Sequence, residues 1–173
     1  MAQVAARLAP ALPGVCDCRG TVHPGDPALE LCGTPIKIES LAELQASTNG
    51  RRIRLTTGML RFLRHDDELA FVLAHELSHI LLGHAGAFDG PSLREAEIEA
   101  DRLGIQIVSR AGFDTEIAAK LPERLAQSYP TTNRRSAAYG LPAERSAMIA
   151  SALGEGLGRR ARFDPQGLCG PQG

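Results

Sequence analysis

Two histidines stand four residues apart in the segment His75-Glu76-Leu77-Ser78-His79, and a glutamate follows the first of them. On an α-helix this spacing turns the two imidazoles by only about 40° and separates them by a rise of about 6 Å. Both rings can then reach one ion from the same face, while Glu76 can contact a water on that ion. Two histidine ligands beside a carboxylate base are what zinc-assisted hydrolysis requires. Such a short motif also arises by chance, and histidines in apolar helices are often hydrogen-bonded core residues, so its surroundings decide the interpretation.

The residues around this motif predict a buried helix. The acidic residues 66–68 indicate its start, with an acidic N-cap and first turn. Residues 69–82 are almost all apolar, which is typical of a helix inside a domain, and the run is too short to span a bilayer. Burying two histidines and a glutamate there is costly unless they are satisfied, and a bound cation would satisfy all three. We expect Gly83 to end the helix.

A second helix, expected over residues 92–110, has acids on two different faces. Helical periodicity places Glu95 and Glu99 on a polar stripe, which indicates a solvated face. Glu97 and Asp101 instead share a face with residues that are apolar or small, namely Leu93, Ala100, Gly104 and Val108. Two acids on a packing face require a partner.

Zinc ligation would provide that partner. We interpret Glu97 as the third zinc ligand and Asp101 as the acceptor of the free ring N–H of a zinc-binding histidine, His75. The small Gly104 would let the two helices approach closely. The alternative is an ordinary amphipathic helix in which Glu97 and Asp101 pair with nearby arginines.

His84 bears on an extended form of the motif, HExxHxxGxxH, in which a third histidine is a ligand. Leu82 and Ala85 occupy the glycine and histidine positions of that pattern, so His84 is one residue out of register. We therefore do not count it as a ligand. It could contact substrate or a loop, but we favour a structural role at the helix C-terminus, where a partial positive charge is stabilising.

Four segments carry a family resemblance: IRLTTGML (53–60), DELA (67–70), HELSHILLGH (75–84) and EIEADRLG (97–104). They resemble the HtpX/BepA-type zinc metallopeptidases, which are gluzincins related to the CAAX prenyl proteases. The resemblance implies a zinc-dependent endopeptidase acting on proteins or peptides. It implies that His75, His79 and Glu97 bind the zinc and that Glu76 is the catalytic base.

Members of that family often have a His-Pro pair followed by an arginine, after a third helix. In the corresponding stretch here, Tyr129 stands at the histidine position and Arg135 matches the arginine. In the family that histidine can approach the metal and hold the enzyme latent. Tyr129 could instead donate a hydrogen bond to the tetrahedral intermediate, with Arg135 assisting, or it could simply pack; both interpretations stay open.

The chain has 173 residues, a net charge of −1 and 4% aromatic residues, which is compatible with one domain and gives nucleic-acid binding no electrostatic footprint. We expect no transmembrane segment. The prenyl proteases and HtpX have such helices, and BepA continues into helical repeats, so this chain resembles a soluble minimal catalytic domain.

We divide the chain into a Cys/Pro/Gly-rich leader (1–34), a zinc metallopeptidase domain (35–157) and a flexible Gly/Pro-rich tail (158–173). Four cysteines, Cys16, Cys18, Cys32 and Cys169, allow three disulfide pairings, among which the sequence does not choose. Disulfides indicate an oxidising compartment, so we expect an extracytoplasmic location, either a bacterial periplasm or secretion.

The expected fold class is α+β, predominantly α: a zincin-like domain with a small β-sheet and a central HExxH helix. Strands are expected at 35–39 and 53–56, with a turn at Asn49-Gly50 before the second. The family places a strand like the second at the rim of the catalytic cleft, where a peptide could add by backbone pairing. A purely structural hairpin is the alternative. Further helices are expected at 58–63, 115–128 and 142–157.

The sequence therefore predicts a zinc-dependent endopeptidase that cleaves proteins, including unfolded or misfolded ones, with Glu76 as general base. The alternative is a zinc-stabilised binding or chaperone-like domain that engages chains without hydrolysing them.

Overall fold

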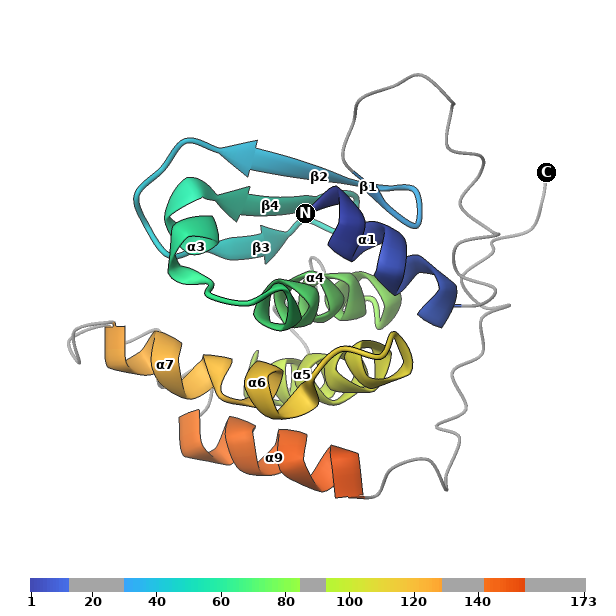
Figure 1. Cartoon of the computed structure of the whole chain (residues 1–173), viewed down its shortest axis with the longest axis vertical. Helices are drawn as coiled ribbons and strands as arrows, with labels where there is room; N and C mark the ends of the chain where they lie inside the picture. The colour runs from blue at the N-terminus through green and yellow to red at the C-terminus, as the bar shows by residue number, and fades with distance from the viewer. Residues whose placement is uncertain (13–29, 85–92, 129–141, 155–173) are drawn as a thin grey trace.

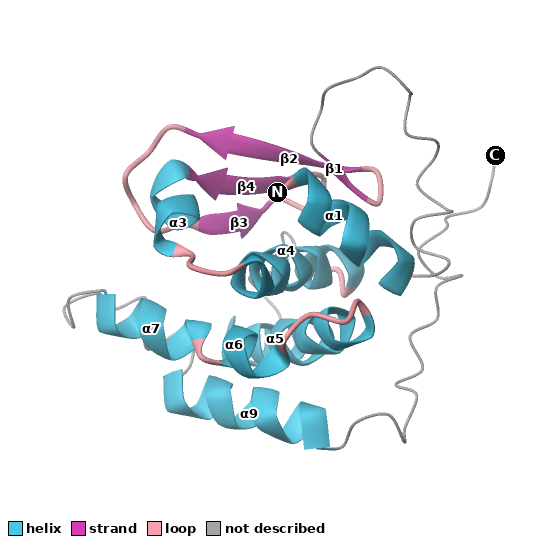
Figure 2. Cartoon of the chain, in the orientation of Figure 1, coloured by secondary structure: helices cyan, strands magenta, loops and turns pink. Residues whose placement is uncertain are grey.

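A computed structural model describes residues 1–12, 30–84, 93–128 and 142–154 of the chain. In Figure 1, a small mixed sheet lies at one end and helices stack beneath it in successive layers. Figure 2 shows that helices make up most of the described fold. The predicted α+β class, predominantly helical with a small sheet, is confirmed.

The sheet has four strands in the order β1-β2-β4-β3. They are β1 (Glu30–Leu31), β2 (Thr34–Glu39), β3 (Ala46–Thr48) and β4 (Ile53–Thr56). The two predicted strands correspond to β2 and β4, which pair in parallel, so they do not form a hairpin with each other. The turn at Asn49-Gly50 instead joins β3 to β4, which are antiparallel.

The expectation that a peptide pairs with the strand at 53–56 is wrong. That strand, β4, has β2 on one side and β3 on the other, so its backbone groups are already paired on both edges. The short strand β3, which the sequence did not predict, lies at one edge of the sheet instead, and it contacts the central helix.

From residue 57 onwards the described helices lie close to the predicted ones, whereas the two at the N-terminus were not predicted. They are α1 (Ala2–Leu8) with the short 3-10 helix η1 (Ala9–Ala11), α3 (Thr57–Phe62), α4 (Asp66–Leu81), α5 (Leu93–Arg110), α6 (Thr115–Ala119), α7 (Leu121–Ser128) and α9 (Pro142–Gly154). The single helix expected over 115–128 is two helices, broken at Lys120. Pro122 explains the break, because it has no N–H to donate and its ring clashes with the carbonyl four residues earlier.

The motif helix α4 lies at the centre of the fold, between the sheet and α5 (Figure 1). Nearly all of its residues are buried, as the apolar run predicted. The helix begins at Asp66, but its capping residue is His65, one position before the expected acidic cap. Gly83 follows the last turn with φ of 72°, a conformation that favours glycine.

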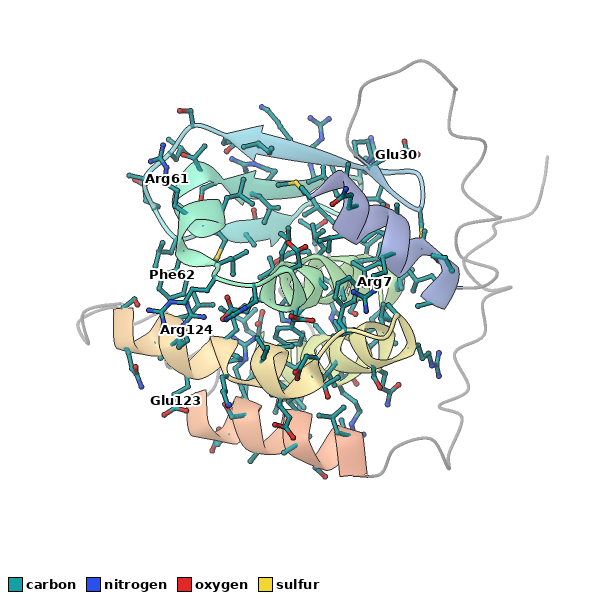
Figure 3. The ribbon with its side chains drawn as sticks, viewed as in Figure 1. Arg7, Glu30, Arg61, Phe62, Glu123 and Arg124 are labelled. Carbon is teal, nitrogen blue, oxygen red and sulfur yellow. The ribbon has the colours of Figure 1, made fainter. Side chains whose placement is uncertain are left out.

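The first helix, α1, belongs to the same hydrophobic core as α4, although it lies within the predicted leader. Val4, Ala5 and Leu8 are buried in that core. Arg7 donates to the backbone carbonyls of Ala111 and Gly112 just beyond α5, and its guanidinium lies 3.9 Å from the centre of the Phe113 ring. Figure 3 shows Arg7 reaching from α1 towards these helices. The N-terminal helix is thus held against the domain by its apolar residues and by Arg7.

A second arginine ties α7 to the start of α4. Arg124 forms an ion pair with Glu68, which is only 1% exposed, and donates to the carbonyl of Phe62 at 3.1 Å. Figure 3 shows Arg124 beside Phe62. Glu68 also accepts a hydrogen bond from the Arg64 backbone N–H at 2.6 Å, so one buried carboxylate links three segments of the chain.

Within the described residues, no helix has both the length and the apolarity needed to cross a membrane.

Candidate metal centre

The site forms between α4 and α5, which pack against each other more extensively than any other pair of described elements. Gly104 on α5 allows this close approach, as predicted: a Cβ there would lie 3.1 Å from the backbone nitrogen of His75 and 3.2 Å from its Cα. A larger residue would push the helices apart at the first histidine of the motif.

Three predicted ligand side chains converge across this contact: His75, His79 and Glu97. The two Nε2 atoms are 3.1 Å apart, and each lies 3.4 Å from a carboxylate oxygen of Glu97. Tetrahedral zinc, with bonds of about 2.0–2.1 Å to nitrogen, places its ligand atoms about 3.3 Å from one another. Two nitrogens and an oxygen at these separations therefore fit a zinc ion.

Asp101 supports His75 from the side away from the other ligands. Its Oδ1 lies 2.9 Å from His75 Nδ1, although the direction of the N–H falls outside a well-aligned hydrogen bond. Asp101 is fully buried and accepts two hydrogen bonds from Arg145 on α9, at 2.6 and 2.7 Å. The Arg145 guanidinium also lies 3.6 Å from Glu97. One arginine thus neutralises both buried acids of α5.

His84 contacts the other ligand histidine. Its Nδ1 lies 3.1 Å from His79 Nδ1, and its Nε2 lies 3.1 Å from Glu99 Oε2. Glu99 is 61% exposed, as its place on the polar stripe predicted, and it still contacts His84. Burial lowers the pKa of His84, so the ring tends to be neutral.

Glu76 is buried beside the ligands and is 7% exposed. Burial raises its pKa to about 7, and the charge of neighbouring His75 offsets only part of that effect. A carboxylate with this pKa can gain or lose a proton near neutral pH, as a general base must.

His75 and Glu97 carry opposite charges in the metal-free protein. Burial lowers the pKa of His75, but the contacts with the carboxylates of Asp101 and Glu97 outweigh burial and raise that pKa to about 10. For Glu97, burial acts to raise the pKa, but the contacts with His75 and His79 hold it well below its usual range. A proton therefore occupies the site where a cation would bind, which is typical of ligand clusters without their metal.

Sequence reasoning missed Arg145. The sequence did contain a signal for it, because two acids one turn apart on a packing face need a counter-charge. Pairing with arginines is the alternative to ligation considered above. Both kinds of contact are present in the structure: Glu97 faces the histidines, while Asp101 contacts both His75 and Arg145, so pairing with an arginine does not exclude ligation. The predicted Tyr129 and Arg135 lie outside the described residues, as do the tail 158–173 and three of the four cysteines. Cys32 is disulfide-bonded.

Comparison with known proteins agrees with this geometry. Residues 44–89, which include β3, β4, α3 and the whole motif helix, match peptidase family M48. The mitochondrial metalloendopeptidase OMA1 of Saccharomyces cerevisiae is 29% identical, over 63% of this chain and 43% of the relative, so the chain spans less than half of that protein. The non-hydrolytic alternative is not favoured by either match. Over these residues the chain is thus similar to metallopeptidases of family M48, and its His75, His79 and Glu97 side chains could hold a metal ion.

Proposed function

We propose that this chain is an endopeptidase in which Glu76 activates a water molecule for attack on a peptide bond. The observation that supports this most directly is the convergence of His75, His79 and Glu97 from two packed helices, with Glu76 buried beside them. When bound there, zinc would supply Lewis-acid chemistry, polarising the scissile carbonyl and lowering the pKa of water.

Glu76 handles the proton in this proposal. Its pKa of about 7 means that the carboxylate form is available at neutral pH and can still be protonated during the reaction. Glu76 accepts a proton from the attacking water and then donates it to the leaving amine nitrogen as the C–N bond breaks. Asp101 and Arg145 keep His75 in place, because a carboxylate held by a guanidinium has little freedom to turn.

We propose that the substrate backbone pairs with β3. Within the described part of the chain β3 has a partner strand on one side only, and it contacts α4. Pairing through backbone groups requires no particular side chain, so it would suit unfolded or misfolded proteins of varied sequence.

Three further assignments remain proposals. The segments at 53–60, 67–70, 75–84 and 97–104 support an HtpX/BepA-type member of the family. The disulfide at Cys32 supports an oxidising, extracytoplasmic compartment. Tyr129 and Arg135 are proposed to assist at the developing oxyanion, on the family resemblance alone.

Casein cleavage by the full chain, with and without a chelator, tests the activity. We expect cleavage that stops with the chelator and returns with added zinc. Glu76→Gln should lower the rate by about 10²–10⁴-fold while leaving zinc binding intact, because the amide cannot take a proton. Glu95→Gln, which changes an exposed acid on α5, is the matched control and should cleave at the wild-type rate.

The competing function has a distinct outcome. A wild-type protein that binds one zinc per chain yet cuts no unfolded protein would favour the binding or chaperone-like domain over the peptidase.

A further inference from the structure

The two ligand histidines have different partners on the ring nitrogen that faces away from the metal cluster. For His75 that partner is Asp101, whereas for His79 it is a second imidazole, His84, followed by Glu99. We propose that His84 and Glu99 form a positioning relay that fixes the tautomer and orientation of His79 as a metal ligand. This inference rests on the zinc site described above.

These contacts allow an arrangement of protons that suits a metal at Nε2 of His79. Glu99 is a carboxylate and can only accept, so His84 donates its Nε2–H across the 3.1 Å contact. In this arrangement the His84 ring carries its one proton on Nε2, and the lone pair on Nδ1 accepts the Nδ1–H of His79 across 3.1 Å. His79 consequently keeps an unprotonated Nε2, the atom that lies 3.1 Å from His75 Nε2 and 3.4 Å from Glu97. The relay thus leaves His79 in the form that a metal requires.

The backbone holds His84 in the position that this relay needs. Gly83, with φ of 72°, turns the chain at the end of α4, and the His84 N–H donates to the His79 carbonyl at 2.9 Å. The two rings then meet edge to face, with centroids 5.3 Å apart and planes at 67°. A hydrogen bond between the same two residues in the backbone restricts how far their rings can separate.

A purely structural role for His84 makes a different prediction. A histidine that merely stabilises the helix C-terminus would affect the folding of the metal-free protein and leave zinc affinity unchanged. A positioning residue would affect zinc affinity even where folding is unchanged, and a residue that keeps an acceptor near the Nδ1 position would partly restore it.

The test is the zinc dissociation constant of the full chain, measured by competition with a chromophoric chelator. Losses of this kind of support typically cost about 10–100-fold in metal affinity. We expect His84→Leu to weaken zinc binding by about 10-fold, the low end of that range, because Glu99 is 61% exposed. His84→Asn, which retains an acceptor, should bind zinc more tightly than His84→Leu. Glu99→Gln should weaken binding by a smaller factor, and Glu95→Gln should match the wild type.

A second measurement keeps the test decisive. Long-range proton–nitrogen NMR spectra of the metal-free protein should show His79 protonated on Nδ1 in the wild type and as a mixture of tautomers in His84→Leu. If His84→Leu does not fold, Glu99→Gln at the surface provides the same comparison.

Zinc binding by His84→Leu equal to that of the wild type, in a protein with an unchanged thermal midpoint, would overturn the relay. Failure of the peptidase proposal looks different: the wild type would bind zinc and cut nothing, and the ranking of zinc affinities would still decide the role of His84.

Discussion

In the candidate metal centre, His75 and His79 are supported by different kinds of side chains. His75 is supported by Asp101, a fully buried carboxylate that a guanidinium holds with two hydrogen bonds. His79 is supported by His84 and then by Glu99, a carboxylate that is 61% exposed to solvent. The support of His75 therefore depends on a buried ion pair, whereas the support of His79 depends on a carboxylate exposed to water.

Because of this difference, we expect the two sides to affect folding stability and zinc affinity to different degrees. Buried charges attract each other strongly but are costly to leave unpaired, so the His75 side ties folding to the site. Charges at the surface are screened by water, so the His79 side can orient a ligand without much effect on folding. Mutations on the first side should change stability and affinity together, and those on the second should change affinity alone.

The largest expected effect comes from Asp101→Ala. It removes the support of His75 and leaves Arg145, whose side chain is 18% exposed, without its main partner. Breaking a buried ion pair from one side typically costs about 3–5 kcal/mol. Urea unfolding of the metal-free protein should show this loss, whereas Glu99→Ala should change the free energy of unfolding by less than about 0.5 kcal/mol.

The milder Asp101→Asn isolates the effect on the metal. Its amide keeps the size of the side chain but weakens the acceptor of His75, so zinc affinity should fall about 10–100-fold. Unchanged affinity in that variant would remove Asp101 from the metal centre.

Zinc affinity should also depend steeply on pH, because of the raised pKa of His75. In the metal-free protein the pKa of His75 is raised to about 10, so at neutral pH a proton occupies the ring and zinc must displace it. Affinity should therefore rise with pH, by up to about tenfold per unit between pH 7 and 9. Glu76, whose pKa is about 7, also loses its proton as the pH rises, and its negative charge further favours zinc binding.

Asp101→Asn is the informative comparison for this titration. The contact with Asp101 is one of the causes that raise the pKa of His75, so its loss should flatten the pH dependence. A wild-type affinity that does not change between pH 7 and 9 would contradict the proton competition.

Gly104→Ala tests the close approach of the helices. The added methyl carbon would lie 3.1 Å from the His75 nitrogen, so α4 or α5 must shift. Overpacking of this kind typically costs about 1–3 kcal/mol, and it would move His75 relative to Glu97. Calorimetry and zinc titration should both show the change, whereas Ser109→Ala, at an exposed position of α5, should be almost silent.

The sequence predicted the elements that carry the site because their signals are local. Helical periodicity placed Glu97 and Asp101 on the buried face of α5 and Glu95 and Glu99 on its exposed face, and the structure agrees. An apolar run interrupted by the motif predicted that α4 would be central, and it is buried on nearly every face.

The missed features depend on contacts between distant segments. Arg145 lies 44 residues from Asp101, and nothing within α9 itself indicates that this arginine is the counter-charge. The strand β3 is three residues long and has no alternating pattern to detect. His84 was assigned to the helix end because its contacts with His79 and Glu99 appear only after Gly83 turns the chain and α5 packs alongside.

The smallest expected effect comes from Arg94→Gln. This variant tests whether an exposed ion pair between the helices contributes less than a buried one. Arg94 pairs with Glu144 at 2.6 Å and joins α5 to α9, the same two helices that Arg145 and Asp101 join. The side chains of Arg94 and Glu144 are 51% and 40% exposed, so the pair should contribute no more than about 1 kcal/mol. Thermal unfolding and zinc affinity should both stay near the wild-type values. A loss as large as that of Asp101→Ala would mean that the number of bridges between α5 and α9, and not their burial, determines how firmly the metal centre is held.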